Sequence, residues 1–148
     1  LRFVMAGTPG AGHEAVFRLL EDPELGSCVQ NVGYAPTDDL PFLFSGADIF
    51  LFPSLYEGFG LPVLEAMACG TPVITSRTTS LPEVAGDAAL LVDPEDTEAI
   101  AEAIRSFLAD PSLRESYAKR GRSRAGMFPW ERTARDTLAV YRNMLQQG

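Results

Sequence analysis

Two glutamates with a glycine-containing loop between them are the residues whose types and spacing best suit chemistry. Glu57 and Glu65 flank Gly58-Phe59-Gly60-Leu61, and a helix is expected to begin where this run ends. Glycine lets a backbone come close to a ligand, and the free N–H groups at a helix N-terminus bind anions without a cation. Two carboxylates would repel a phosphate, but they accept hydrogen bonds from hydroxyls. The pattern favours a ligand with hydroxyls on either side of a phosphate, as in a sugar–phosphate–ribose.

Each glutamate also has a purely structural explanation. Glu57 can cap the helix that follows it, and Glu65 can pair with a buried arginine. Either explanation is credible for one residue. Neither explains the pair together with the glycines between them.

A second glycine-rich stretch, Gly7-Thr8-Pro9-Gly10-Ala11-Gly12-His13-Glu14, follows the first expected strand. It nearly matches a P-loop, but His13 replaces the lysine and Glu14 replaces the Ser or Thr that would hold magnesium. Gly10-x-Gly12-x-x-Ala15 fits a loose dinucleotide fingerprint, although no acidic residue ends the next strand. We expect a loop that a phosphate or sugar can approach, and a plain turn into a helix explains the glycines equally well.

Other catalytic or metal-binding arrangements have little support. His13 is the only histidine and no GxSxG motif occurs, so a Ser-His-Asp triad would depend on this one residue. Cys28 and Cys69 are far apart without a CxxC spacing, which predicts free, buried thiols in a reducing compartment, here the cytoplasm. Four acidic residues surround an expected helix start and are interpreted as capping residues, not metal ligands: Asp93, Glu95, Asp96 and Glu98.

The composition is that of one soluble globular domain, with 148 residues, 46% hydrophobic and 22% charged, and a net charge of −8. Residues 1–113 hold 17 acidic and 4 basic side chains, whereas residues 114–148 hold 3 acidic and 8 basic ones. The acidic main body argues against a nucleic-acid partner, and we interpret the basic section as the solvated side of helices. The longest apolar run, 49–53, is too short to cross a membrane.

Strand signals alternate with helical patterns along the chain. Strands are expected at 1–6, 29–33, 49–52, 72–76 and 89–92. Helices are expected at 15–20, from Thr37 as N-cap, at 62–69, from Asp96, at 112–120 and after Pro129. The 62–69 helix is apolar except at Glu65, which predicts that it is buried. We therefore predict an α/β fold with an open, mostly parallel, Rossmann-like sheet, helices on both faces, and ligands at the carboxyl ends of the strands.

The stretch from Phe52 to Ile74, which contains the Glu57-x7-Glu65 element, resembles the retaining glycosyltransferases of the GT-B fold, family 4. The resemblance continues through Leu81–Val84 and Ala89–Pro94 into Phe128–Glu131, so it covers nearly the whole chain. It implies the C-terminal, donor-binding half of a GT-B fold. The whole enzyme would transfer a hexosyl group from a nucleotide diphosphate sugar to an acceptor with retention of configuration.

The resemblance also implies roles for individual residues. Glu57, as the catalytic residue, contacts the donor sugar hydroxyls, and Glu65 hydrogen-bonds the ribose. The amides of Gly58, Phe59, Gly60 and Leu61 hold the diphosphate, and the base sits near Gly33 and Tyr34. We place Gly7 in the same donor site. No metal and no cofactor is expected, because the helix N-terminus takes the place of a cation.

The same resemblance predicts how the chain is organised. A donor-binding domain is expected at 1–128, without the family's first donor-domain strand and helix, and a crossover helix at 129–148. The expected partners are the nucleotide sugar and an N-terminal acceptor domain. Peripheral membrane contact through that domain and self-association through the crossover helix are further expectations. These 148 residues alone are expected to bind donor weakly or not at all and to transfer nothing.

Two alternatives remain open at this point. A non-catalytic α/β binding or assembly module could use the same architecture, and it predicts that Glu57→Ala and Glu65→Ala leave ligand binding unchanged. A dehydrogenase-like Rossmann domain would depend on the 10–15 glycine loop and would bind NAD(P).

Overall fold

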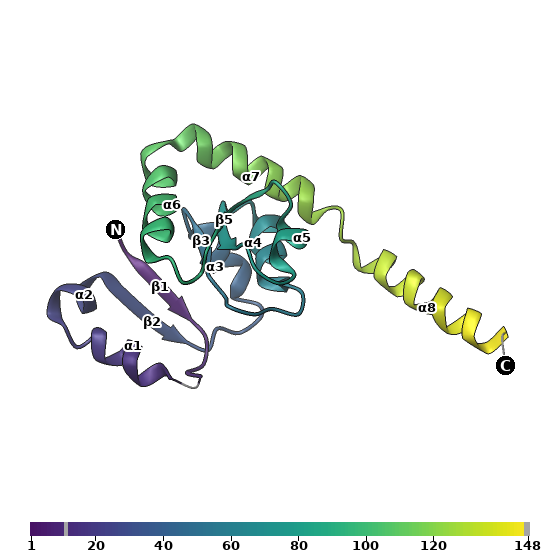
Figure 1. Cartoon of the computed structure of the whole chain (residues 1–148), viewed down its shortest axis with the longest axis horizontal. Helices are drawn as coiled ribbons and strands as arrows, with labels where there is room; N and C mark the ends of the chain where they lie inside the picture. Colours follow the sequence, from purple (N-terminus) through teal and green to yellow (C-terminus); the bar gives the residue numbers. More distant parts are fainter. Residues whose placement is uncertain (11, 147–148) are drawn as a thin grey trace. The chain divides into compact units, whose positions relative to one another are not determined.

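The computed structural model describes residues 1–10 and 12–146 and divides the chain into two compact units, Leu1–Leu40 and Pro41–Gly148 (Figure 1). Ala11 of the first glycine loop and residues 147–148 of the expected C-terminal segment lie outside the described residues.

The first unit is built on two parallel strands, β1 (Phe3–Ala6) and β2 (Val29–Gly33), both of which were predicted. The connection between them contains α1 (His13–Leu19), which was predicted, and α2 (Pro23–Cys28), which was not. Asp22 begins α2 by accepting the N–H groups of Glu24 and Leu25. Cys28 ends this surface helix and is exposed, so the prediction of a buried thiol is wrong there, whereas Cys69 is half-buried.

The second unit has a parallel sheet in the order β3 (Phe50–Phe52), β4 (Val73–Ser76), β5 (Ala89–Val92). All four residues of the central strand β4 are buried, as expected of a parallel strand covered on both faces. Its helices are α3 (Leu40–Gly46), α4 (Leu61–Cys69), α5 (Leu81–Ala85), α6 (Thr97–Ala109), α7 (Pro111–Ala125) and α8 (Trp130–Gln146). Figure 1 shows the strands between α6 and the α4–α5 pair, which confirms the predicted α/β architecture.

Helix α3 begins two residues later than predicted. The sequence indicated an N-cap at Thr37, but residues 37–39 form a turn and the helix begins at Leu40. An N-cap at Thr37 would require Pro41 to donate the first intrahelical hydrogen bond, and proline has no N–H. Starting at Leu40 puts Pro41 in the first turn, where no donor is needed.

The core of the second unit joins the sheet to α4, α6 and α7. Phe107 of α6 is fully buried beside Ile74 and Val92. A Cβ on Gly121 would lie 3.2 Å from Met67 Cγ, so α7 crosses α4 in close contact at this glycine. Gly121 lies beyond the predicted end of this helix at Arg120, and α7 continues to Ala125, five residues further than predicted.

Three arginines of α7 bind backbone carbonyls, so the interpretation of this basic section as a solvated face is wrong for them. Arg114 donates to Phe107 O at 2.7 Å, Arg120 to Asp87 O at 2.8 Å and Arg124 to Val84 O at 2.9 Å. These acceptors lie in the last turns of α6 and α5 or just after α5. Helix ends leave such carbonyls without intrahelical partners.

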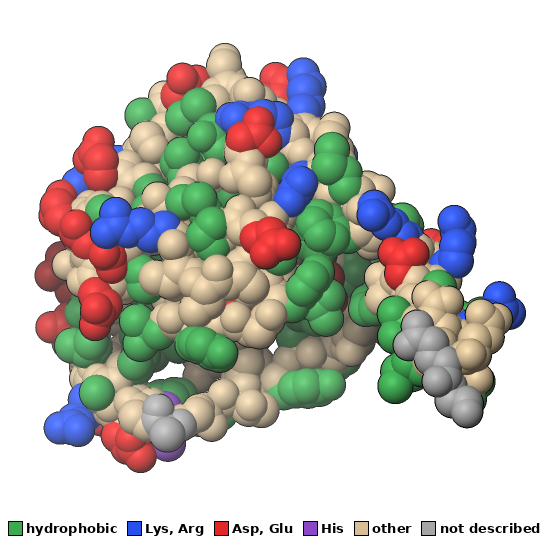
Figure 2. Space-filling model, turned by 45° about the vertical axis from the view of Figure 1, so that its right-hand side comes forward, with side chains coloured by type: hydrophobic (Ala, Val, Ile, Leu, Met, Phe, Trp, Pro, Cys, Tyr) green, Lys and Arg blue, Asp and Glu red, His purple; other side chains and the backbone are tan. Residues whose placement is uncertain are grey.

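Helix α8 has no buried residue among Trp130–Gln146. Figure 2 shows hydrophobic and basic side chains together along it, at the right of the view. Its exposed apolar residues include Trp130, Leu138, Tyr141, Met144 and Leu145. None of the helices in the described part of the chain has the length and hydropathy needed to cross a bilayer.

Candidate functional site

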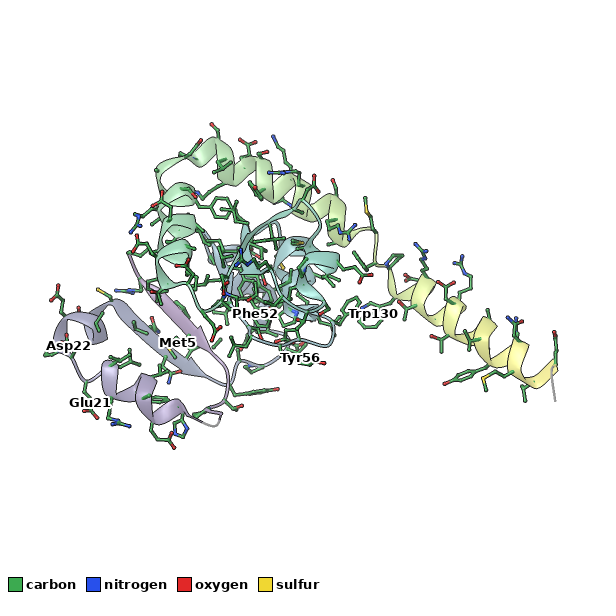
Figure 3. All side chains as sticks on the ribbon, in the orientation of Figure 1. Met5, Glu21, Asp22, Phe52, Tyr56 and Trp130 are labelled. Carbon is green, nitrogen blue, oxygen red and sulfur yellow. The ribbon has the colours of Figure 1, made fainter. Side chains whose placement is uncertain are left out.

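The carboxyl ends of β3 and β4 support the predicted ligand loop. Residues 53–60 follow β3 and lead into α4, and residues 77–80 follow β4 and lead into α5. Because β3 and β4 are parallel neighbours, both connections leave the same edge of the sheet. Figure 3 shows Phe52 inside the unit and Tyr56 on the loop that follows it.

A row of hydroxyl groups ties these two connections together. Thr75 Oγ1 donates to Phe52 O at 2.9 Å, and Ser76 Oγ donates to Ser54 O at 2.6 Å. Further along, Thr78 Oγ1 reaches Leu55 O at 3.4 Å. The row begins in β4 and follows the 53–60 loop outward from the sheet.

The last two hydroxyls of the row contact the glutamate–glycine loop itself. Thr79 Oγ1 accepts the N–H of Glu57 at 3.2 Å. Ser80 Oγ lies 3.0 Å from Glu57 O and 2.9 Å from Phe59 O. Sequence reasoning missed this segment, although five of the six residues at 75–80 are Ser or Thr. A buried strand is usually apolar, so a run of Ser and Thr at its end is the signal that could have revealed this segment.

Helix α4 begins with open backbone donors, as predicted. Its N-cap, Gly60, has φ of 109° and provides no side-chain cap. A Cβ there would lie 2.7 Å from Leu81 Cδ2, so only glycine fits. Within residues 1–10 and 12–146, no acceptor is found for the N–H groups of Gly58, Phe59, Gly60 and Leu61. Four donors at the positive end of a helix suit an anion.

Gly58 differs from Gly60. Its φ is not in the left-handed region, and a Cβ would meet nothing within 4 Å. Packing within the described chain therefore gives no reason for glycine here. Space beside the backbone at Gly58 is what a closely approaching ligand needs.

The two glutamates have neither of the structural partners considered above. Glu57 is half-buried and Glu65 is exposed. In the described part of the chain, neither carboxylate forms a hydrogen bond or ion pair, so Glu57 does not cap α4 and Glu65 does not pair with an arginine. The prediction of a fully buried α4 is wrong: one face packs against the core, and Glu65 and Ala68 lie on the open face.

The predicted residues of the first unit form a separate group. Gly7 donates its N–H to Gly33 O at 2.7 Å, so the structure brings these two together. Gly7 also lines a hollow of about 200 Å³, together with Gly10, His13 and Asn31. Tyr34 is 70% exposed. The other predicted residues, 57–61 and Glu65, belong to the second unit.

The acidic cluster has the capping role that was predicted for it. Asp96 caps α6 by accepting the N–H of Ala99 at 2.9 Å. Asp93 accepts the N–H of Glu95 and pairs with Arg77 at 2.6 Å, and these two contacts, in that order, lower the pKa of Asp93 from its usual value. No group of three or more metal-ligating side chains is found in the part of the chain that the structure describes.

Comparison with known proteins adds evidence of common descent. The family described as "Glycosyl transferases group 1" matches residues 1–124. The O-antigen chain mannosyltransferase B of Escherichia coli is 43% identical over 139 residues, which are 94% of this chain and 36% of the relative. The D-inositol 3-phosphate glycosyltransferase of Corynebacterium jeikeium is 34% identical over 150 residues, 98% of this chain and 36% of the relative. The chain thus spans roughly a third of these relatives.

Solved structures show the same fold. A sucrose-phosphate synthase from Thermosynechococcus elongatus is 35% identical with a TM-score of 0.89, covering 98% of this chain and 39% of its own. HepE from Anabaena, solved with UDP and glucose, is 21% identical with a TM-score of 0.84, covering 94% of this chain and 40% of its own. At that identity the second likeness is evidence for the fold alone.

Proposed function

This chain belongs to the glycosyl transferases group 1 family and has the α/β fold of GT-B enzymes, and we propose that it forms the nucleotide-sugar donor site of a retaining, family 4 hexosyltransferase. The observation that carries the proposal is the start of α4. Four backbone N–H groups without acceptors in the described chain lie between two carboxylates that are also without partners there.

In this proposal the diphosphate of the donor binds the amides of Gly58, Phe59, Gly60 and Leu61. The amides and the helix dipole stabilise the negative charge that grows on the diphosphate as the sugar leaves. The same donors would replace a metal ion in this step. Space beside Gly58 allows the phosphate oxygens to reach the backbone.

The two glutamates bind hydroxyl groups on either side of the diphosphate. Glu57, the catalytic residue, accepts hydrogen bonds from the donor sugar and fixes its orientation for transfer. Glu65, exposed on α4, accepts hydrogen bonds from the ribose. Gly33 and Tyr34 stay the residues that we propose for the base, and within their own unit Gly7 donates its N–H to Gly33 O. The names of the E. coli relatives favour a mannosyl group as the sugar to test first.

The acceptor and the rest of the enzyme are also part of the proposal. The exposed apolar residues of α8 would pack against an acceptor domain, so that the donor site faces a cleft between domains. Two free cysteines fit a cytoplasmic location. Glycosyl transfer by these 148 residues alone would contradict the proposal that an acceptor domain is needed.

Binding of nucleoside diphosphates by glutamate variants tests the proposal. UDP, GDP and ADP, and the matching mannose and glucose conjugates, are titrated into the ¹⁵N-labelled chain, because NMR detects millimolar affinity. Glu65→Ala should weaken binding of the free nucleotides, and Glu57→Ala should weaken only binding of the sugar conjugates. Glu102→Ala, which changes an exposed glutamate of α6, is the matched control. Unchanged binding in both site variants would instead favour a non-catalytic module.

A further inference from the structure

The hydroxyls of Thr79 and Ser80 hold the backbone of the glutamate–glycine loop. We infer that both are positioning residues of the donor site, a role that rests on the proposed function. Together they bind three backbone groups of the loop: the N–H and the C=O of Glu57 and the C=O of Phe59. The two side chains belong to the connection after β4, so the loop is held from outside its own segment.

Peptide geometry explains why these contacts matter for anion binding. In a trans peptide the C=O of one residue and the N–H of the next point in opposite directions. Ser80 holds the C=O groups of Glu57 and Phe59, at 3.0 and 2.9 Å, on one side of the loop. The N–H groups of Gly58 and Gly60 must therefore point to the other side. These are two of the four N–H groups that have no acceptor in the described chain.

Ser80 binds the loop instead of capping the helix that follows it. It is the N-cap residue of α5, where a serine oxygen normally accepts an N–H from the first turn. No such bond is present for Ser80, and its hydroxyl proton is shared between two carbonyls of the loop. The side chain thus serves the loop before α4 instead of its own helix.

Thr79 is held in a conformation that threonine rarely adopts. Among the described residues, Thr79 is the only one other than glycine that has a positive φ, which is 56°. A β-branched residue is strained there, and glycine or asparagine would fit better. The hydroxyl that accepts the N–H of Glu57 gives a reason for threonine at this strained position.

The experiment compares Ser80→Ala, Ser80→Thr and Thr79→Gly with the unchanged chain. Thr79→Gly removes the acceptor while relieving the strain, so a loss of function in it does not arise from misfolding. Ser106→Ala, which removes a similar half-buried hydroxyl–carbonyl bond in α6, is the control. Far-UV circular dichroism and melting temperature monitor folding. Backbone ¹⁵N relaxation, measured without ligand, reports the order of residues 57–60, and NMR titration reports the affinity for UDP, GDP and ADP.

Ser80→Ala and Thr79→Gly are expected to lower the order parameters at 57–60 from about 0.85 towards about 0.6. Both variants should lower the affinity for the best-bound nucleoside diphosphate at least fivefold. The affinities of Ser80→Thr and Ser106→Ala should stay within twofold of that of the unchanged chain. Unchanged order, or a loosened loop with unchanged affinity, overturns the positioning role. If Ser80→Ala does not fold, Thr79→Gly decides between these results. The proposed function is tested separately: it is overturned, and the positioning role with it, if the best-bound nucleotide binds Glu65→Ala as tightly as the unchanged chain, whatever the loop dynamics show. If the unchanged chain binds none of the three nucleotides, the order parameters at 57–60 decide whether Thr79 and Ser80 hold the loop.

Discussion

Two glycine-containing loops in this chain follow a parallel strand and lead into a helix, yet they are held in different ways. In the 7–14 loop the Gly7 N–H is taken by Gly33 of the neighbouring strand, and His13 Nδ1 lies 2.8 Å from Gly10 O within the loop itself. In the 53–60 loop, hydroxyls from another segment hold the carbonyls, and the N–H groups of 58–61 are left without acceptors in the described chain. Thr8 and Gly10 also have N–H groups without acceptors there, so the side-chain support of the carbonyls from another segment is what separates the two loops. Glycine spacing alone therefore does not define an anion site. The groups that hold the carbonyls decide where the N–H groups point.

The largest effect is expected from Gly60→Ala. Alanine at φ of 109° is strained, and its Cβ would lie 2.7 Å from Leu81 Cδ2. We expect a loss of about 2–4 kcal/mol in the free energy of unfolding and loss of nucleotide binding. Gly10→Ala in the other loop meets nothing within 4 Å and should change stability by less than about 1 kcal/mol. Urea unfolding of both variants checks this, and equal losses would remove the distinction between the loops.

Gly58→Ala separates binding from stability. A Cβ at this position meets nothing within 4 Å in the described part of the chain and its φ is ordinary, so the free energy of unfolding should stay within about 1 kcal/mol of the unchanged chain. Nucleoside diphosphate binding should nevertheless weaken about tenfold, or by about 1.4 kcal/mol, since the methyl group fills the space that the ligand uses. Titration of Gly58→Ala beside Gly10→Ala makes the comparison. Equal affinity in the two variants would show that the ligand does not approach Gly58.

Phe128→Ala tests the second support of the 53–60 loop. The Phe59 ring packs edge-on against Phe128 at 6.0 Å between centroids, and Arg124 lies over the Phe128 ring at 5.0 Å. Both rings are partly exposed, so we expect a loss of about 1–2 kcal/mol from chemical unfolding. Nucleotide affinity should fall less than in Ser80→Ala, because the backbone bonds remain. If nucleotide affinity fell more in Phe128→Ala than in Ser80→Ala, the ring contact would be the main support of the 53–60 loop.

The smallest effect concerns the Arg77–Asp93 pair beside the same sheet edge. The N–H of Glu95, first, and Arg77, second, lower the folded-state pKa of Asp93 below its ordinary 3.8. These two contacts therefore stabilise the fold above that value, and their contribution is lost as the pH falls through the lower, folded pKa. Melting temperatures of the unchanged chain and Asp93→Asn should differ slightly at pH 7 and converge below about pH 4. Because both groups are exposed, the difference should also shrink in high salt. If the melting temperatures still differ at pH 2, the difference would come from lost capping geometry and not from the charge of Asp93.

The sequence predicts the strands and the start of α4 well because their signals are local. The runs at 29–33 and 73–76, and the punctuation of Pro62 and Gly70, are each sufficient for a prediction. Other features depend on residues far apart in the sequence. The bonds from Ser80 to the loop span more than twenty residues, and those of Arg124 to α5 span forty. Charge patterning could not distinguish such an arginine from one facing solvent, nor show that Glu65 lies on the open face of α4.

Residue-resolved NMR of the ¹⁵N-labelled chain with a nucleoside diphosphate shows whether the amides before α4 bind the diphosphate. UDP, GDP and ADP are added in turn, with inorganic phosphate at equal ionic strength as the control. We expect the largest saturable amide shifts at four residues: Gly58, Phe59, Gly60 and Leu61. Shifts confined to the 7–14 loop, or none at 58–61 when a nucleotide binds, would contradict this expectation.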